Sequence, residues 1–297
     1  MRRPQWAAHQ SEKSLMNPVV AVIAPGAMGA PVAKRMVEHG LKVLTSLQDR
    51  SAATVARASA AGLTAASDDE IAGADFILSI LPPGDALPLA QRFAPALAAS
   101  NSKPVYVDCN AVSPPTVARI AAAIAPTGCP FVDAGIIGAP PRPDYGPTFY
   151  ASGPDAPRFA SLGQFGLKVR VLDGPLSAAS ALKMSYGGIT KGITAIAAAM
   201  FLAASRGGSA DALFLELKES QPQLLAWFTR QIPNMYSKAY RWVAEMEEVS
   251  DFAGETAASK HMYAAVAEFY EHLACDFASD QKDVSALKDF ISKNAKN

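Results

Sequence analysis

The stretch VVAVIAPGAMG, residues Val19–Gly29, decides the fold class of this chain. Its apolar part, Val19–Ala24, ends in a turn that contains glycine, and an amphipathic segment follows over Ala27–His39. A second apolar run begins at Leu41. Strand, tight turn, helix and strand in this order are typical of the unit that opens a dinucleotide-binding domain.

The residues of the turn suit a phosphate ligand. Gly26 would let the backbone approach a pyrophosphate, and Gly29 would let the new helix pack against the strand. The N–H groups at the start of the helix, around Ala27 and Met28, would face the negative charge. Ala24 replaces the first glycine of the G-x-G-x-x-G fingerprint, so a turn and helix without a ligand is the alternative interpretation.

The composition indicates two domains with an extensive core. The chain has 297 residues, 50% of them hydrophobic, and its 27 basic residues balance 27 acidic ones. This balance argues against nucleic acid or a membrane surface as the main partner. The three cysteines lie far apart and the four histidines are scattered, which predicts no disulfide framework, no metal site and a cytoplasmic location. Residues 1–17 are polar and are expected to form a flexible arm, not a secretory signal.

Apolar runs alternate with helical patterns from Val19 to Asp173, which predicts an α/β domain with a doubly wound, mainly parallel sheet of the Rossmann type. The expected strands are Val19–Ala24, Leu41–Ser46, Asp75–Leu81, Pro104–Asp108, Phe131–Asp133, Phe149–Ala151 and Val169–Leu172. The expected helices are Ala27–His39, Ser51–Ala61, Ala86–Ala98, Pro115–Ala125 and Ala156–Phe165. The pattern then changes, so we expect a dinucleotide-binding domain over residues 18–175 and an all-helical domain for substrate binding and dimerisation over residues 176–297.

One long helix, about 45 Å in length at 1.5 Å per residue, is predicted over Leu176–Ser205. It is apolar nearly all round, so we expect it to be buried between other elements. Gly187, Gly188 and Gly192 each disfavour a helix by about 1 kcal/mol relative to alanine, so a neighbouring helix or a ligand should gain from their small size. The helical part is too small to bury these apolar faces alone, which predicts a homodimer.

The segment after the second strand, Ser46–Ser51, is the region that contacts the adenosine ribose in such folds. An acidic residue there bonds the 2′-hydroxyl of NAD, and an arginine pairs with the 2′-phosphate of NADP. Both Asp49 and Arg50 are present. Arg50 between the hydroxyls of Ser46 and Ser51 favours NADP. The alternative is that Asp49 and Arg50 only begin the next helix.

Further polar and glycine residues follow the later strands. Leu81 and Pro82 leave the third main strand in an extended conformation, and Asn110 follows the fourth, offering a donor and an acceptor at the expected mouth of the cleft. A turn or helix cap is the alternative role of Asn110. Ser113 precedes a proline and is expected to be a helix N-cap. The next strand leads into a neutral glycine-rich loop, Asp133–Pro141.

Lys183 is the most informative single residue. It lies early in the long, almost uncharged helix, where burial of a lysine is costly unless it is paired or functional. Its pKa responds readily to burial, which suits general acid/base chemistry. An exposed strip of the helix is the alternative location. Thr190 shares the face of Lys183, whereas Lys191 is rotated away and is interpreted as a second charge in the cleft or as a surface residue.

Five motifs occur in a characteristic order and spacing. They are APGAMG at residues 24–29, LPPG at 81–84, VDCN at 107–110 with SP at 113–114, FVDAG at 131–135 with its glycine loop, and the lysine at 183. In this order they resemble the β-hydroxyacid dehydrogenase family, which includes 3-hydroxyisobutyrate and 6-phosphogluconate dehydrogenases. The C-terminal stretch AYRWVAEMEE, Ala239–Glu248, resembles a fungal and bacterial branch whose C-terminal domain has a poorly defined function.

The resemblance implies a role for each matched residue. The residues that would contact the cofactor phosphates are Gly26, Ala27, Met28 and Gly29. Leu81 and Pro82 would border the cofactor ribose and nicotinamide. Asn110 would lie near the nicotinamide or the substrate, and Lys183 would be the general acid/base, so these two are the catalytic candidates.

The chain departs from the family at the substrate. The residues implied for substrate binding are Gly135, Ile137, Gly138, Gly187 and Thr190. The family has Ser-Gly-Gly where this chain has Ile137-Gly138-Ala139, and it has asparagine four residues after the lysine, where this chain has Gly187. These departures leave room for a bulkier or less polar substrate than a small hydroxy acid.

The resemblance and the lysine together predict an NAD(P)-dependent oxidoreductase that moves a hydride between nicotinamide and a hydroxyl-bearing carbon of a small organic substrate. The related imine reductases typically lack this lysine, so Lys183 favours alcohol–carbonyl chemistry. The alternatives are an imine reductase and a catalytically weak NADP-binding sensor or scaffold.

Overall fold

The computed structural model describes residues 17–292, so the predicted arm lies, apart from Asn17, outside the described residues. The chain divides into two compact units between Lys183 and Met184. The division falls inside one helix, α8, which begins at Ala178, shortly after the boundary expected at 175–176.

The first unit contains an eight-stranded sheet in the order β3-β2-β1-β4-β5-β6-β7-β8. The strands are β1 Val20–Ile23, β2 Val43–Thr45, β3 Thr64–Ala65, β4 Phe76–Ser79, β5 Val105–Asp108, β6 Phe131–Ile137, β7 Thr148–Ser152 and β8 Lys168–Val171. Strands β1 to β6 are parallel, β7 runs antiparallel to β6, and β8 is parallel to β7. The predicted doubly wound Rossmann-type sheet is therefore confirmed, and its strand order reverses between β1 and β4, where such sheets bind ligands.

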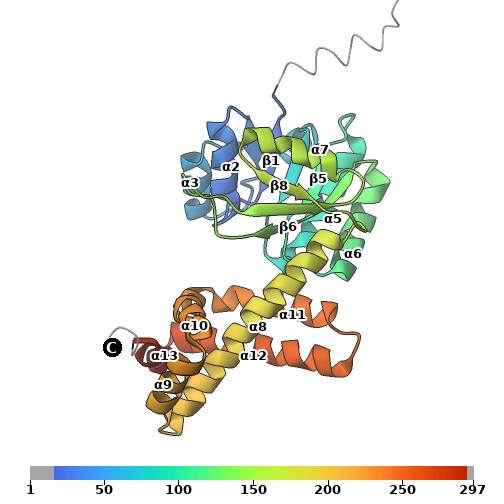
Figure 1. Ribbon diagram of the computed structural model, residues 1–297. Helices are drawn as coiled ribbons and strands as arrows, with labels where there is room; N and C mark the ends of the chain where they lie inside the picture. The colour runs from blue at the N-terminus through green and yellow to red at the C-terminus, as the bar shows by residue number, and fades with distance from the viewer. Residues whose placement is uncertain (1–16, 293–297) are drawn as a thin grey trace, which may run out of the picture. The chain divides into compact units, whose positions relative to one another are not determined.

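Helices cover both faces of this sheet (Figure 1). They are α2 Gly29–Glu38, α3 Ala52–Ala60, α4 Asp68–Ala72, α5 Pro83–Ala99, α6 Pro114–Ile124 and α7 Ala156–Ala160. Successive side chains of each buried strand point to opposite faces of the sheet. On one face, Val20 and Val22 of β1 belong to the same apolar cluster as Met36 of α2 and Phe159 of α7. On the other face, Ala21 and Ile23 belong to the same cluster as Phe93 of α5.

Three features of this unit differ from the sequence prediction. Strand β3 has two residues and α4 has five, which is too short for a periodic pattern to be recognised. The glycine-rich loop expected from Asp133 is strand as far as Ile137, because β6 pairs with β7 up to the register Ile137↔Thr148. The loop therefore starts at Gly138.

The second unit is helical throughout the described residues. Its helices are α8 Ala178–Arg206, which begins in the first unit, α9 Ala210–Ser220, α10 Pro222–Met235, α11 Ala239–Phe252, α12 Ala257–Ala278 and α13 Lys282–Ser292. The expected close neighbour of the glycines on α8 is present, because a Cβ at Gly188 would lie 3.0 Å from the Tyr263 hydroxyl and 3.1 Å from Val249. By length and hydropathy alone α8 could cross a membrane, a criterion that core helices of soluble proteins also meet.

The predicted burial of α8 on all sides is wrong for a single chain. Five large apolar side chains along the helix are exposed, with exposed fractions of 40–60%. They are Tyr186, Ile189, Ile193, Ile196 and Met200. Their spacing of three or four residues places them in one stripe, which we call the α8 stripe.

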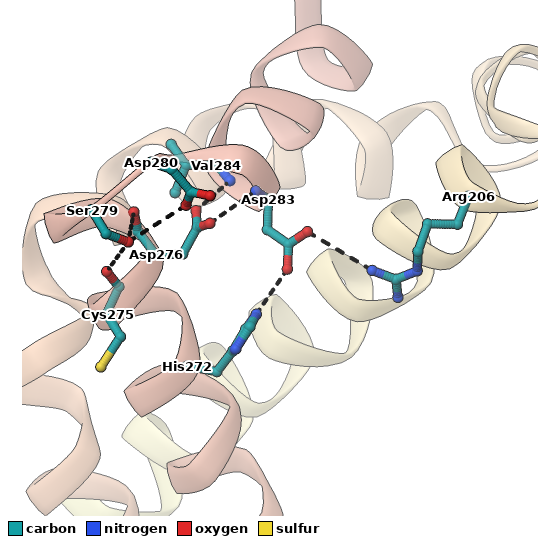
Figure 2. A network of polar contacts seen from close by, with 8 residues as sticks. All are labelled: Arg206, His272, Cys275, Asp276, Ser279, Asp280, Asp283 and Val284. Atoms are coloured by element: carbon teal, nitrogen blue, oxygen red, sulfur yellow. Dashed lines mark hydrogen bonds and ion pairs between the residues drawn. The ribbon is translucent and has the colours of Figure 1, made fainter.

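Figure 2 shows the polar network that holds α13 in the second unit. The buried Asp276 carboxylate accepts hydrogen bonds from the backbone N–H groups of Asp283 (3.1 Å) and Val284 (2.9 Å), and so caps the start of α13. Asp283 in turn pairs with His272 at 2.8 Å and with Arg206 of α8 at 3.9 Å. His272 is thus an ordinary surface partner, and residues 17–292 contain no cluster suited to a metal ion.

Candidate functional site

The glycine turn lies at the carboxyl end of β1, beside the reversal of the strand order. A Cβ at Gly29 would overlap the Ala24 carbonyl oxygen, so the expected packing role of this glycine is confirmed. A Cβ at Gly26 would meet nothing within 4 Å, so its backbone borders open space. Ala27 and Met28 directly precede α2, where backbone N–H groups lack helical partners. The turn can therefore hold a phosphate group against its backbone.

The region after β2 places Arg50 at the surface. Asp49 has a left-handed φ of 56°, and Ser51 is the N-cap of α3, accepting from Thr54 N at 3.3 Å. Ser46, expected beside Arg50, instead accepts a 2.9 Å hydrogen bond from Arg92, because the Arg92 side chain is held by Asp68. Ser46 accepts this hydrogen bond and keeps its own hydroxyl hydrogen as a donor, so its predicted role beside Arg50 stays a prediction.

Sequence reasoning missed a second arginine at this end of the sheet. Arg57 of α3 donates to the Pro25 carbonyl in the glycine turn at 3.3 Å and to the Thr54 hydroxyl at 2.8 Å. Its guanidinium therefore lies next to the turn that would hold the phosphates. Its position in the last turn of a helix resembles that of any surface arginine, so the sequence contains no signal for it.

Asn110 ties the ends of two neighbouring strands, β4 and β5, together. Its carbonyl accepts from Leu81 N at 2.5 Å, and its amide donates to the Ser79 hydroxyl at 2.8 Å and to Asp108 Oδ1. Only 2% of Asn110 is exposed. The side chain is thus bonded to protein partners at the carboxyl ends of β4 and β5, and it positions Leu81, whose neighbour Pro82 is the N-cap of α5.

A row of polar side chains crosses the sheet behind Asn110. Ser79 of β4 is in register with Asp108 of β5, Asp108 with Asp133 of β6, and Asp133 with Ser152 of β7. All four are buried, with exposed fractions of 0%. Two buried carboxyls on neighbouring strands are the unusual feature of this row, since buried charges are costly unless they are paired.

The two carboxyls differ in their partners. Asp133 accepts from Ser180 N (2.8 Å), from the Ser180 hydroxyl (2.6 Å) and from the Ser152 hydroxyl (3.2 Å). Burial raises the pKa of Asp133 to about 6, although these hydrogen bonds and Lys183 lower it. Asp108 Oδ2 has no hydrogen-bond partner among the described residues. Burial and, next, repulsion from Asp133 raise the pKa of Asp108 to about 8, against the opposing effects of Asn110 and Lys183.

Lys183 lies at this same edge of the sheet. A Cβ at Gly135 would be 3.1 Å from Lys183 Cβ and 3.0 Å from the Ala179 carbonyl, so the glycine lets α8 pack directly on β6. Lys183 is half-buried and its charge acts on both Asp108 and Asp133. The alternative prediction, that Lys183 lies on an exposed strip of the helix, is therefore wrong.

The remaining predicted substrate residues fall into two groups. Ile137 ends β6, and Gly138, with a φ of +127°, begins a loop closed by the hydrogen bond from Ala139 N to the Tyr145 hydroxyl. Gly187 and Thr190 belong to the second unit, where the Thr190 hydroxyl donates to the Tyr186 carbonyl at 2.8 Å.

Both interpretations of Lys191 are wrong. Its ammonium forms a partly buried ion pair with Glu245 of α11 and lies 5.5 Å from the centre of the Trp242 ring. The Lys191 backbone carbonyl accepts a 2.6 Å hydrogen bond from Tyr270. Lys191 therefore joins α8 to α11 and α12 in the interior of the second unit.

Comparisons with known proteins agree with this geometry. Residues 19–163 match the NAD binding domain of 6-phosphogluconate dehydrogenase, and residues 204–273 match a domain of unknown function, DUF1932. The chain is similar to an uncharacterized 28.5 kDa protein in the 7S RNA 5′ region of Methanothermus fervidus, with 31% identity over 183 residues, 61% of this chain and 69% of that protein. It is also similar to the conserved protein MTH1747, whose structure resembles 3-hydroxyacid dehydrogenases, with 30% identity, a TM-score of 0.67, and coverage of 86% of this chain and 96% of the other.

The chain belongs to the β-hydroxyacid dehydrogenase family. A 3-hydroxyisobutyrate dehydrogenase from Mycobacterium tuberculosis shares the fold, with 21% identity, a TM-score of 0.68, and coverage of 89% of this chain and 96% of the other. Membership and the NAD-binding domain make the protein an NAD(P)-dependent oxidoreductase. The structure fits this cofactor, since the turn offers backbone N–H groups before α2 and open space beside Gly26.

Proposed function

We propose that this oxidoreductase moves a hydride between NADP and a hydroxyl-bearing carbon of a small, hydroxy-acid-like substrate, with Lys183 as general acid/base. The observation that carries the proposal is the position of Lys183. The lysine is packed on Gly135 at the edge of the sheet where the glycine turn lies, and its charge acts on two buried carboxyls.

The chemistry requires a group of this kind. Bound nicotinamide supplies the hydride acceptor or donor. When a carbinol carbon loses a hydride, its hydroxyl must lose a proton, and the neutral amine of Lys183 would take it. In the reverse direction the ammonium would return the proton to the carbonyl oxygen. None of the histidines in residues 17–292 follows a strand. Lys183, which lies near the carboxyl ends of the strands, is therefore the candidate for the group that transfers the proton.

Substitution of Lys183 by methionine tests this role. Lys183→Met keeps the apolar stem that packs on Gly135, so the fold and the cofactor Kd should survive. Turnover should fall by about 10²–10⁴-fold, the usual contribution of a general acid/base. Lys34→Met, which removes an exposed lysine of α2, is the matched control and should retain full turnover. Near-normal kcat in Lys183→Met would refute the assignment.

The last residue of β6 favours two further candidates. Ile137 supplies no hydroxyl where the family has serine, which suits an imine or a less polar carbonyl substrate, or a protein that binds NADP without turnover. A panel of hydroxy acids, aldehydes and imines separates the three functions, with NADPH binding followed by nicotinamide fluorescence. Turnover of imines alone would support the reductase, and binding without any turnover would support a sensor.

The preference for NADP rests on the two arginines near the glycine turn. Arg50 is exposed after β2, and Arg57 is anchored to the Pro25 carbonyl. A guanidinium can form a charge-assisted, bidentate pair with the 2′-phosphate, which NAD lacks.

A homodimer is proposed on the basis of the α8 stripe. Five large apolar side chains on one helix face would remain in water in a single chain. The free-energy cost of this exposure grows with the apolar area in contact with water, so it disfavours the monomer. A second copy that packs against the stripe would remove this area from water. Sedimentation at micromolar concentration tests the proposal, and a monomer would contradict it.

A further inference from the structure

The proposed reaction assigns no role to the two buried carboxyls, Asp108 and Asp133. We propose that Asp108 and Asp133 form a pair with a single negative charge, in which Asp133 anchors α8 beneath Lys183 and Asp108 remains a neutral acid. Both are then positioning residues for the general acid/base. The inference rests on the proposed role of Lys183.

The anchor is a matched contact between β6 and the first turns of α8. Asp133 and Gly135 are two residues apart on a strand and therefore point to the same face. Ser180 and Lys183 are three residues apart on a helix and are therefore neighbours on one face. Ser180 donates two hydrogen bonds to Asp133, and Lys183 packs on Gly135, so one face of α8 rests on one face of β6.

Ser152 strengthens the anchor from the other side. Its single hydroxyl hydrogen is shared between the Leu176 carbonyl (2.7 Å) and Asp133 (3.2 Å), and its oxygen accepts from Ala179 N at 3.0 Å. The negative charge of Asp133 therefore lies at the N-terminus of a 29-residue helix, where the helix dipole favours an anion. A displaced Asp133 would displace Lys183, because only one helical turn separates the lysine from Ser180.

Charge balance determines the state of Asp108. It is fully buried, in register with Asp133, and one of its oxygens has no partner in the described part of the chain. If both carboxyls were ionised, two negative charges would face one lysine in a buried place. With Asp108 protonated, one carboxylate faces one ammonium, and the raised pKa of Asp108, about 8, agrees with this state.

The other titratable groups near the pair do not alter this balance at neutral pH. Tyr106 of β5 and Cys109 after it are buried, and burial raises the pKa of both, so both stay neutral. Lys183 from α8 is the cation whose charge acts on both carboxyls. The general acid/base would thus have a single counter-charge that is fixed to its own helix.

The test is a pH titration of the full-length protein with ¹³C-labelled aspartate carboxyls, followed by NMR. We expect one carboxyl to titrate near pH 8, and this signal should be absent in Asp108→Asn. Asp108→Asn should leave the midpoint of Asp133 close to 6, because Asp108 is already neutral while Asp133 titrates. Lys183→Met should raise both midpoints by about 1 unit, since a nearby cation is lost. Asp69→Asn, on the exposed α4, is the control and should change neither midpoint.

The outcomes separate this inference from the proposed function. The Asp108 signal is the wild-type carboxyl signal that disappears in Asp108→Asn. If this signal shows an ionised carboxyl throughout pH 6–9, the pair has two charges and the inference is wrong, whatever the turnover. Ser180→Ala keeps the charge of Asp133 but removes its 2.6 Å hydrogen bond, so it should raise the Asp133 midpoint and lower kcat without a change in cofactor Kd. An unchanged midpoint and kcat would refute the anchor. Normal turnover of Lys183→Met would refute the proposed function, while the titrations still test the pair.

Discussion

Replacement of Asp108 by asparagine should make the protein less sensitive to rising pH. The carboxyl has an ordinary pKa of 3.8 and a raised pKa of about 8 in the folded chain. Between these values the folded state binds a proton that the unfolded state has lost. The free energy of unfolding therefore falls as the pH rises through this window and levels off above the folded pKa.

The size of the effect follows from the shift. Each pH unit in the window costs about 1.4 kcal/mol, so the buried acid destabilises the wild type by about 4 kcal/mol at pH 7 relative to pH 4. Asp108→Asn has no such cost, but its amide replaces an oxygen that lacks a partner, which costs about 1–3 kcal/mol at every pH. The variant should therefore be less stable than the wild type near pH 4 and more stable near pH 8.

Urea denaturation at several pH values between 4 and 8.5 measures this crossover. The quantity to compare is the slope of the unfolding free energy against pH, since the slope does not depend on the packing of the amide. Asp133 contributes to the slope of both proteins and cancels in the difference. Asp69→Asn should give a curve parallel to that of the wild type. Parallel curves for Asp108→Asn and the wild type would show that Asp108 is ionised in the fold and would refute the reasoning.

Other parts of the chain allow further predictions. Arg57→Ala and Arg50→Ala should weaken NADPH binding more than NADH binding, because only NADPH loses a charge-assisted pair, and equal effects in fluorescence titrations would exclude that arginine from the 2′-phosphate. Gly188→Val should lower the unfolding free energy by about 1–3 kcal/mol in urea, because its side chain would press on Tyr263, and a neutral effect would refute this close packing. Ile196→Glu should shift the sedimenting mass from two chains to one, since it places a charge in the α8 stripe, and an intact dimer would exclude the stripe from the interface.

The arrangement of elements could be predicted because its signals are local. The apolar run before Gly26, the periodic segment after it and the long alanine-rich stretch to Ser205 each reflect how a few adjacent residues face a core. The packing of Gly29 on the Ala24 carbonyl and of Gly188 on Tyr263 followed from the same kind of reasoning, since a residue without a side chain in a helix implies a close neighbour.

The carboxyl pair could not be predicted in this way. Asp108 and Asp133 each end an apolar run, and nothing local distinguishes them from strand-end residues in general. They become a pair only because β5 and β6 align in parallel register, and Asp133 meets Ser180 only because α8 returns to the sheet. The length of β6 depended in the same way on its remote partner Thr148.

The sequence by itself thus determined the fold class, the glycine turn and the lysine on the long helix, because each depends on short-range periodicity or on one residue type. The tertiary structure decided which polar groups are buried together, which arginine touches the turn and which face of α8 stays in water. These properties depend on strand register and helix packing between residues far apart in the chain, and burial then sets the pKa of the groups that meet there.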